Sequence, residues 1–85
     1  MTPWQCRDAR ELLKWSQEDL ATASRVPAEI VAMFEDGTLV GMMDLQVKLR
    51  VTLEAAGIAF PFTIERGQFV PAAVTYSPPD RQRGH

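Results

Sequence analysis

The sequence predicts a mainly α-helical domain of four helices, followed by a C-terminal β-hairpin. Helix-start signals and a helical spacing of apolar residues recur as far as Gly57. Beyond this glycine the apolar residues alternate with period two, which is the period of a strand. We therefore expect a helical domain at residues 1–57, a hairpin at 58–76 and a disordered tail at 77–85.

The first helix should begin in the segment TPWQ and run to about Trp15. Thr2 can cap its first turn, Pro3 suits the first helical position, and Gln5 completes a capping box. The apolar residues of this helix are expected to form one buried stripe. They are Trp4, Ala9, Leu12 and Leu13.

A second start signal, SQED, predicts a helix over about residues 17–24. Ser16 can cap this helix, and Asp19 follows three residues later, near the positive end of the helix dipole. Leu20 and Ala21 should face the core.

The third helix is expected to start at Pro27 and to end at Gly37, a residue typical of helix C-terminal caps. Between these two residues there is no Lys and no Arg, and the whole chain carries a net charge of −2. Such a charge is unusual for a nucleic-acid binder. The apolar face of the helix should consist of Ile30, Val31 and Phe34.

After the loop TLVGMM, Asp44 is expected to cap a fourth helix that ends at Gly57. One apolar line of this helix should face the core. It consists of Leu45, Leu49 and Leu53. A second line, Val47 and Val51, lies on another face. This second line fits either packing against the following segment or a seam between two copies of the chain.

The segment ERGQ predicts the turn of the hairpin. Pro61 and Pro71 should lie at edges or irregularities, because proline cannot donate to a ladder. An isolated two-stranded hairpin is marginal in water. We therefore expect the hairpin to cover the fourth helix and to pair with its twin across a two-fold axis. The predicted dimer interface consists of Val47, Val51, Phe60, Phe62, Ile64 and Phe69.

The composition narrows the class of protein. Eighty-five residues make one domain, and its only cysteine, Cys6, cannot form an internal disulfide, which fits a reducing, cytoplasmic setting. No apolar run approaches the roughly 20 residues that span a bilayer, so no membrane partner is expected. His85 is the only histidine, and no metal-ligand cluster or catalytic set can be assembled. We expect no cofactor and no enzymatic activity.

The segment WSQEDLATASRVPAEIVAMFEDG belongs to a pattern of residue types at fixed spacing. The pattern consists of Arg10, Ser16-Gln17, Leu20-Ala21, Val26 and Glu35-Asp36-Gly37. Over about residues 4–64 the chain resembles the Cro/repressor-like helix-turn-helix proteins of the XRE family. The resemblance implies a bacterial transcription regulator that binds double-stranded DNA, at a palindromic operator, as a homodimer. It also implies a buried ion pair between Arg10 and Glu35.

Three features depart from the family pattern. Arg25 replaces the usual turn glycine, and a left-handed conformation at that position costs a non-glycine residue roughly 1 kcal/mol. Pro27 replaces the usual Ser or Thr cap. TLVGMM replaces an Arg-rich stretch, which removes phosphate-binding charge and adds apolar surface.

The resemblance implies that the recognition helix, about residues 27–36, enters the major groove. Glu29 can accept a hydrogen bond from cytosine N4, and Ala or Met can contact a thymine methyl group. The candidates on this helix are Pro27, Ala28, Glu29, Ala32 and Met33. The candidates for phosphate contact are Lys14, Gln17, Arg25 and Thr38. Arg25 also fits a solvated turn residue, and Glu29 a solvent-facing helix charge.

An apolar stretch where the family places polar residues supports an alternative function. It consists of Leu39, Val40, Met42 and Met43. Met is adaptable at binding surfaces. The chain would then be a protein-binding modulator, similar to an antiactivator or antitoxin, on a scaffold that has lost DNA binding. These residues also fit a segment that folds back on the core or on a dimer mate.

Overall fold

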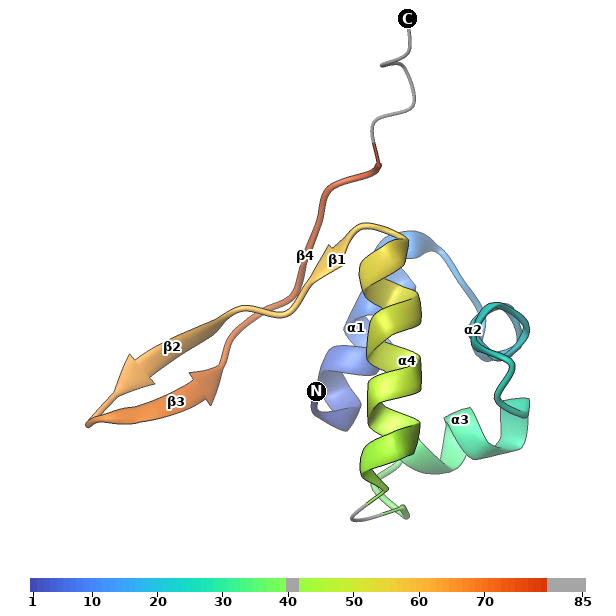
Figure 1. The fold of residues 1–85 in the computed structure, drawn as a ribbon, viewed down its shortest axis with the longest axis horizontal. Helices are drawn as coiled ribbons and strands as arrows, with labels where there is room; N and C mark the ends of the chain where they lie inside the picture. The colour runs from blue at the N-terminus through green and yellow to red at the C-terminus, as the bar shows by residue number, and fades with distance from the viewer. Residues whose placement is uncertain (40–41, 80–85) are drawn as a thin grey trace, which may run out of the picture.

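A computed structural model describes residues 1–39 and 42–79 of the chain. In this part of the chain four helices precede four short strands (Figure 1). The helices are α1 (Pro3–Leu13), α2 (Gln17–Ser24), α3 (Ala28–Glu35) and α4 (Met43–Ala55). The strands are β1 (Ile58–Ala59), β2 (Phe62–Glu65), β3 (Gln68–Pro71) and β4 (Thr75–Tyr76). Val40 and residues 80–85 of the expected tail lie outside the described residues.

The predicted capping box at Thr2 and the predicted cap at Ser16 are both present, and Ser16 also forms a capping box with Asp19. The Thr2 hydroxyl accepts a hydrogen bond from the Gln5 amide at 3.1 Å, and the Gln5 side chain accepts one from the Thr2 amide at 2.9 Å. Ser16 and Asp19 exchange the same two bonds at 3.0 and 2.8 Å. Each box satisfies two backbone donors that the first turn leaves free, and the predicted bounds of α2 are confirmed.

The buried face of α1 differs from the prediction. Trp4 and Leu12 are exposed, so the expected stripe is wrong for these two residues. The residues of α1 that are buried are Gln5, Cys6 and Ala9. Two of these are small, which lets α1 approach α3 and α4 closely with a narrow face and leaves the large side chains at its flanks. The helix also ends at Leu13, because Lys14 adopts a left-handed conformation with φ 61°.

The start of α4 also differs from the prediction. Met42, and not Asp44, occupies the N-cap position, and it makes no side-chain capping hydrogen bond. Asp44 lies in the first helical turn, where its charge still favours the positive end of the helix dipole. The predicted core line is confirmed, because Leu45, Leu49 and Leu53 are buried.

The hydrophobic core lies where the helices meet. Helix α4 packs against both α1 and α2, and α2 packs against α3 (Figure 1). The largest fully buried side chains are Leu20, Leu49, Leu53, Val31 and Cys6. Within residues 1–39 and 42–79, no helix has the length and apolar character needed to cross a membrane.

Strands β1 and β4 pair antiparallel and form the stem of the C-terminal segment, with Ile58 opposite Tyr76. Gly57 precedes this stem with φ 111°, and its carbonyl accepts a hydrogen bond from the Ser77 amide at 2.9 Å. A Cβ atom at Gly57 would collide with the Ser77 carbonyl oxygen. The close approach of the two strands therefore requires glycine at this position.

Strands β2 and β3 form the predicted hairpin, with Ile64 opposite Phe69. The two turn residues, Arg66 and Gly67, have φ values of 53° and 78°. Positive φ at both central positions is typical of a type I′ turn, which matches the natural twist of the strands. Pro61 lies outside the strands and Pro71 ends β3, as expected for residues that cannot donate to a ladder.

The hairpin does not cover α4, so that part of the prediction is wrong. Strands β2 and β3 project away from the helices (Figure 1), and Phe62, Ile64 and Phe69 are exposed. At the base of the hairpin, between β3 and β4, the Ala72 carbonyl accepts a hydrogen bond from the Gln5 side chain at 3.0 Å. This bond ties the base of the hairpin to α1 and leaves the outer face of α4 free in the monomer.

Candidate nucleic-acid interface

Helices α2 and α3 are joined by a short connection, residues 25–27. Arg25 ends α2 in a left-handed conformation, with φ 63° and ψ 34°. The Val26 side chain is buried in the core, and its amide donates to the Ala21 carbonyl at 3.2 Å. The turn therefore has the left-handed geometry for which glycine is usual, and Arg25 carries a strain of roughly 1 kcal/mol.

Helix α3 has one face in the core and an outer face with little charge. Val31 and Phe34 are buried, as predicted, and Ile30 packs partly against the core. Of the predicted base-contacting residues, Glu29 is exposed, whereas Ala28, Ala32 and Met33 are half-buried and Pro27 is exposed at the N-cap position without a capping side chain. The outer face is therefore apolar and acidic.

Two predicted phosphate-binding side chains are available to solvent. Lys14 and Arg25 are exposed, and both occupy C-cap positions in the left-handed conformation, at the ends of α1 and α2. Each side chain is thus carried by a turn that the packed helices on either side hold in place. A cation at such a position can contact a phosphate without entering a groove.

Gln17, a predicted phosphate contact, also makes a hydrogen bond within the chain. Its side-chain amide donates to Glu35 Oε1 at 3.1 Å and is half-buried. Gln17 therefore links the first turn of α2 to the last turn of α3. Sequence reasoning missed this contact, although the family pattern contains both residues.

Thr38 lies beside the carboxylate of Asp36. Its hydroxyl donates to Asp36, and its amide donates to Asp36 Oδ1 at 2.9 Å. The hydroxyl bond and the amide bond from Thr38 together hold the pKa of Asp36 below its usual range. An Asp two residues before a Thr is a turn signal that predicts these contacts. The negative charge makes Thr38 a poor phosphate ligand.

Glu35 is the polar centre that fixes α3 to the other helices. Its carboxylate receives two hydrogen bonds from Arg10, from Nε at 2.7 Å and from a terminal nitrogen at 2.8 Å. The side chains of Arg10 and Glu35 are only 13% and 4% exposed. Arg10 also donates to the Trp15 carbonyl at 2.9 Å, and the Cys6 thiol donates to Glu35 at 3.3 Å.

The electrostatics of this cluster follow from its burial. Burial acts to raise the pKa of Glu35, but the hydrogen bonds from Arg10, Gln17 and Cys6 outweigh it and leave this pKa below its usual range. Burial, together with the charge of Glu35, raises the pKa of the Cys6 thiol far above its usual value. Cys6 is therefore an unreactive hydrogen-bond donor in the core.

The predicted contact residues carry a formal net charge of +1, from Lys14 and Arg25 against Glu29, and the neighbouring Asp36 offsets this charge. In the part of the chain that the structure describes, no group of three or more His, Cys, Asp or Glu residues could hold a metal ion.

No family model matches the chain, and no curated protein matches its sequence.

Proposed function

We propose that the chain is a helix-turn-helix transcription regulator of the XRE type, which binds double-stranded DNA as a homodimer in the bacterial cytoplasm. The observation that carries the proposal is the pairing of α2 and α3 through a three-residue connection with Val26 buried, which leaves the outer side of α3 uncovered. In helix-turn-helix proteins the second of two such helices lies in the major groove.

The proposed function involves few contacts between the protein and the DNA bases. Glu29 accepts a hydrogen bond from the exocyclic amine of one cytosine, and Ala28, Ala32 and Met33 contact thymine methyl groups. Because α3 carries no cation, it supplies selectivity and little affinity. The sequence of the DNA is read by contact and shape more than by charge.

Affinity comes from phosphate contacts and from the second copy. Lys14 and Arg25 flank the paired helices and neutralise about two phosphates per protomer. Each neutralised phosphate contributes roughly −0.9 to the slope of log affinity against log salt, so we expect a shallow slope of about −2 per protomer. Two weak modules joined in one dimer bind a palindromic site far more tightly than either alone.

Fluorescence anisotropy with a labelled duplex from the chain's own upstream region tests the proposal. The protein should bind this duplex more tightly than a shuffled duplex of the same composition, and the salt series should give the shallow slope. The shuffled duplex serves as the control for sequence selectivity. Failure to bind either duplex at low salt would contradict the proposal.

The apolar residues before α4 favour a second candidate, a protein-binding modulator on a helix-turn-helix scaffold. Met42 and Met43 are exposed, whereas Leu39 is half-buried and packs against the core. An exposed pair of methionines is typical of adaptable protein-binding surfaces. A heparin column at low salt separates the two candidates, because a regulator should be retained and a modulator should flow through.

A further inference from the structure

Two apolar faces of the protein are exposed in the monomer. The first, which we call the hairpin face, consists of Phe62, Ile64 and Phe69. The second, the α4 face, consists of Met43, Val47 and Val51. A monomeric protein rarely exposes contiguous apolar patches larger than a few hundred Å² without a function for them.

The hairpin face is ordered and one-sided. Phe62 and Ile64 are two residues apart on β2, and Phe69 lies opposite Ile64 on β3, so all three side chains share one side. The rings of Phe62 and Phe69 meet edge to face, with centroids 4.7 Å apart. Their exposed fractions, with that of Ile64, lie between 60% and 70%. Thr63, between them, faces the other side.

The α4 face is a straight apolar line with balanced charges at its borders. Its three residues recur every fourth position, and their exposed fractions lie between 54% and 66%. On one border Arg50 and Glu54 form an ion pair at 2.9 Å. On the other border lie Asp44 and Lys48, one of each sign. The α4 face therefore does not repel a segment that carries both positive and negative charges.

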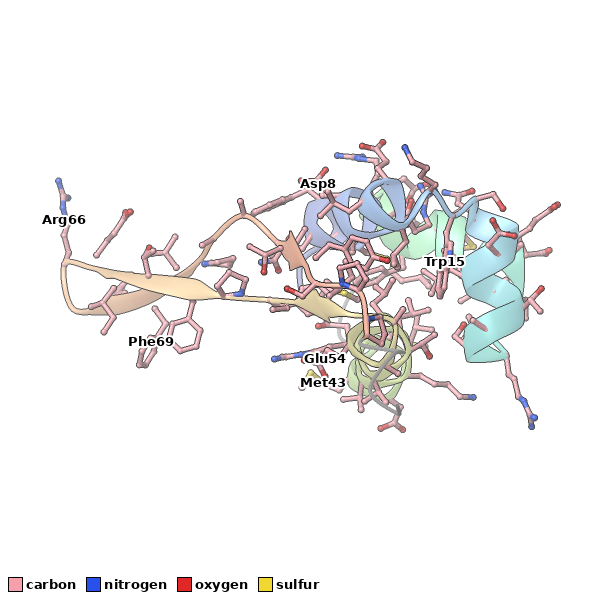
Figure 2. All side chains as sticks on the ribbon, turned by 90° about the horizontal axis from the view of Figure 1, so that it is seen from above. Asp8, Trp15, Met43, Glu54, Arg66 and Phe69 are labelled. Carbon is pink, nitrogen blue, oxygen red and sulfur yellow. The ribbon has the colours of Figure 1, made fainter. Side chains whose placement is uncertain are left out.

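The two faces lie at one corner of the molecule. In Figure 2 Phe69 lies on the side of the hairpin on which α4 is found, and Met43 and Glu54 lie on the side of α4 that is turned toward the hairpin. The stem directs the hairpin away from the helices (Figure 1), so it does not lie on its own α4. An α4 face from a second copy can occupy the hairpin face, and the reverse contact can form at the same time.

We infer that in a dimer the hairpin face of one copy lies across the α4 face of the second copy, and reciprocally. This inference rests on the homodimer included in the proposed function. Each four-residue strand is about 13 Å long, which matches the roughly 12 Å from Met43 to Val51 along α4. Glu65 and Arg66 at the hairpin tip carry both signs, as the borders of α4 do.

Both faces would add apolar area to a dimer interface. Phe62 and Phe69 are 60% and 70% exposed, so at about 150–250 Å² for each aromatic side chain they offer roughly 200–300 Å² per copy. A standard interface buries about 800 Å² per partner, and Ile64, Met43, Val47 and Val51, each more than half exposed, add to the aromatic area. Because each contact occurs twice in a two-fold arrangement, every copy buries both of its apolar faces.

Disulfide trapping between two single variants tests the arrangement. We would mix Val47→Cys, carrying a tag that shifts its mass, with untagged Phe69→Cys at micromolar concentration, exchange subunits under reducing conditions, and then oxidise mildly. The matched control pairs Val47→Cys with Thr63→Cys, because Thr63 is exposed on the opposite side of the hairpin. The native Cys6 is buried with a raised pKa and stays silent. Circular dichroism checks that each variant is folded.

The mixed Val47→Cys and Phe69→Cys dimer should be linked roughly tenfold or more above the Thr63→Cys control, because apposed thiols meet at an effective concentration of about a millimolar. Linkage of each variant with itself would overturn the inference, since it would indicate α4 against α4 and hairpin against hairpin. The absence of any linked dimer would also overturn it. DNA binding is measured separately, so a regulator with another dimer interface would be distinguished from a chain that does not bind DNA.

Discussion

The helical region and the hairpin differ in how many contacts their side chains make within the chain, as Glu35 and Phe69 illustrate. Glu35, at the end of α3, accepts hydrogen bonds from Arg10, Gln17 and Cys6, and its side chain is 4% exposed. Phe69, on the hairpin, is 70% exposed and meets the ring of Phe62. In residues 1–39 and 42–79 every buried side-chain nitrogen and oxygen has a partner.

The difference indicates where each region obtains its stability. The helices satisfy their buried polar groups within one chain, so we expect them to keep their structure in a monomer. The hairpin is a two-stranded element with its apolar face uncovered, and such elements are marginal in water. Its order should therefore depend on a second copy, in which the apolar face is buried.

The largest effect should come from the helical region, in the variant Arg10→Met. It leaves the Glu35 charge buried without its bidentate partner, and breaking such a pair costs about 3–5 kcal/mol. Arg50→Met is the matched control, because Arg50 pairs with Glu54 in an exposed position worth about 0.3–0.5 kcal/mol. Urea unfolding followed by circular dichroism measures both. Equal destabilisation of the two variants would show that the Glu35 cluster is not a special structural centre.

The second largest effect should be a loss of dimerisation in the hairpin variant Phe69→Glu. A charge at the centre of the hairpin face should convert the dimer to a monomer while the helical circular dichroism signal remains. Thr63→Glu, on the opposite side of the hairpin, should leave the dimer intact. Sedimentation at micromolar concentration measures the change. A Phe69→Glu protein that stays dimeric would exclude the hairpin from the interface.

The third effect is a pH dependence of the free energy of unfolding. The pKa of Glu35 is lower in the folded chain than the value of about 4.3 for an unfolded glutamate. Its contribution to stability is therefore present above pH 4.3 and is lost as the pH falls through the lower, folded pKa. Glu35→Gln should be less stable at neutral pH and should lose less stability on acidification. A wild-type chain and a Glu35→Gln variant with the same acid dependence would argue against this origin.

The smallest effect should come from the turn, in the variant Arg25→Gly. Glycine adopts the left-handed conformation without the penalty of roughly 1 kcal/mol, so thermal stability should be kept or slightly increased. Loss of one phosphate contact should weaken binding to all sequences alike and flatten the salt slope by about one. Glu29→Ala should instead relax preference at one base pair. Unchanged DNA binding in both variants would favour the protein-binding candidate.

Local signals in the sequence predict much of the helical domain. The caps at Thr2 and Ser16 and the hairpin turn at Gly67 are each determined by neighbouring residues, and the structure has all of them. The left-handed position of Arg25 is implied by the family resemblance, and the structure has it as well. The core line of α4 follows from its spacing, because only one face of a helix can meet the other helices.

The features that the sequence did not predict depend on contacts between residues that are distant in the chain. Apolar character did not predict that Trp4 and Leu12 are exposed, because the small residues of α1 determine which face approaches its neighbours. The base of the hairpin is tied to α1 by a bond between Gln5 and Ala72, which lie 67 positions apart. The hydrogen bond between Gln17 and Glu35 likewise joins two helices, so no local pattern predicts that the Gln17 side chain donates to Glu35.

Sedimentation velocity of the intact chain, alone and with a duplex from its own upstream region at low salt, tests directly whether the chain is a dimeric DNA-binding regulator. A dimeric DNA-binding regulator should sediment alone with twice the monomer mass of 9.5 kDa, and the duplex should move faster in its presence, with two copies bound. A species of 9.5 kDa that leaves the duplex sedimenting as free DNA would show that the chain is neither a dimer nor a DNA-binding protein.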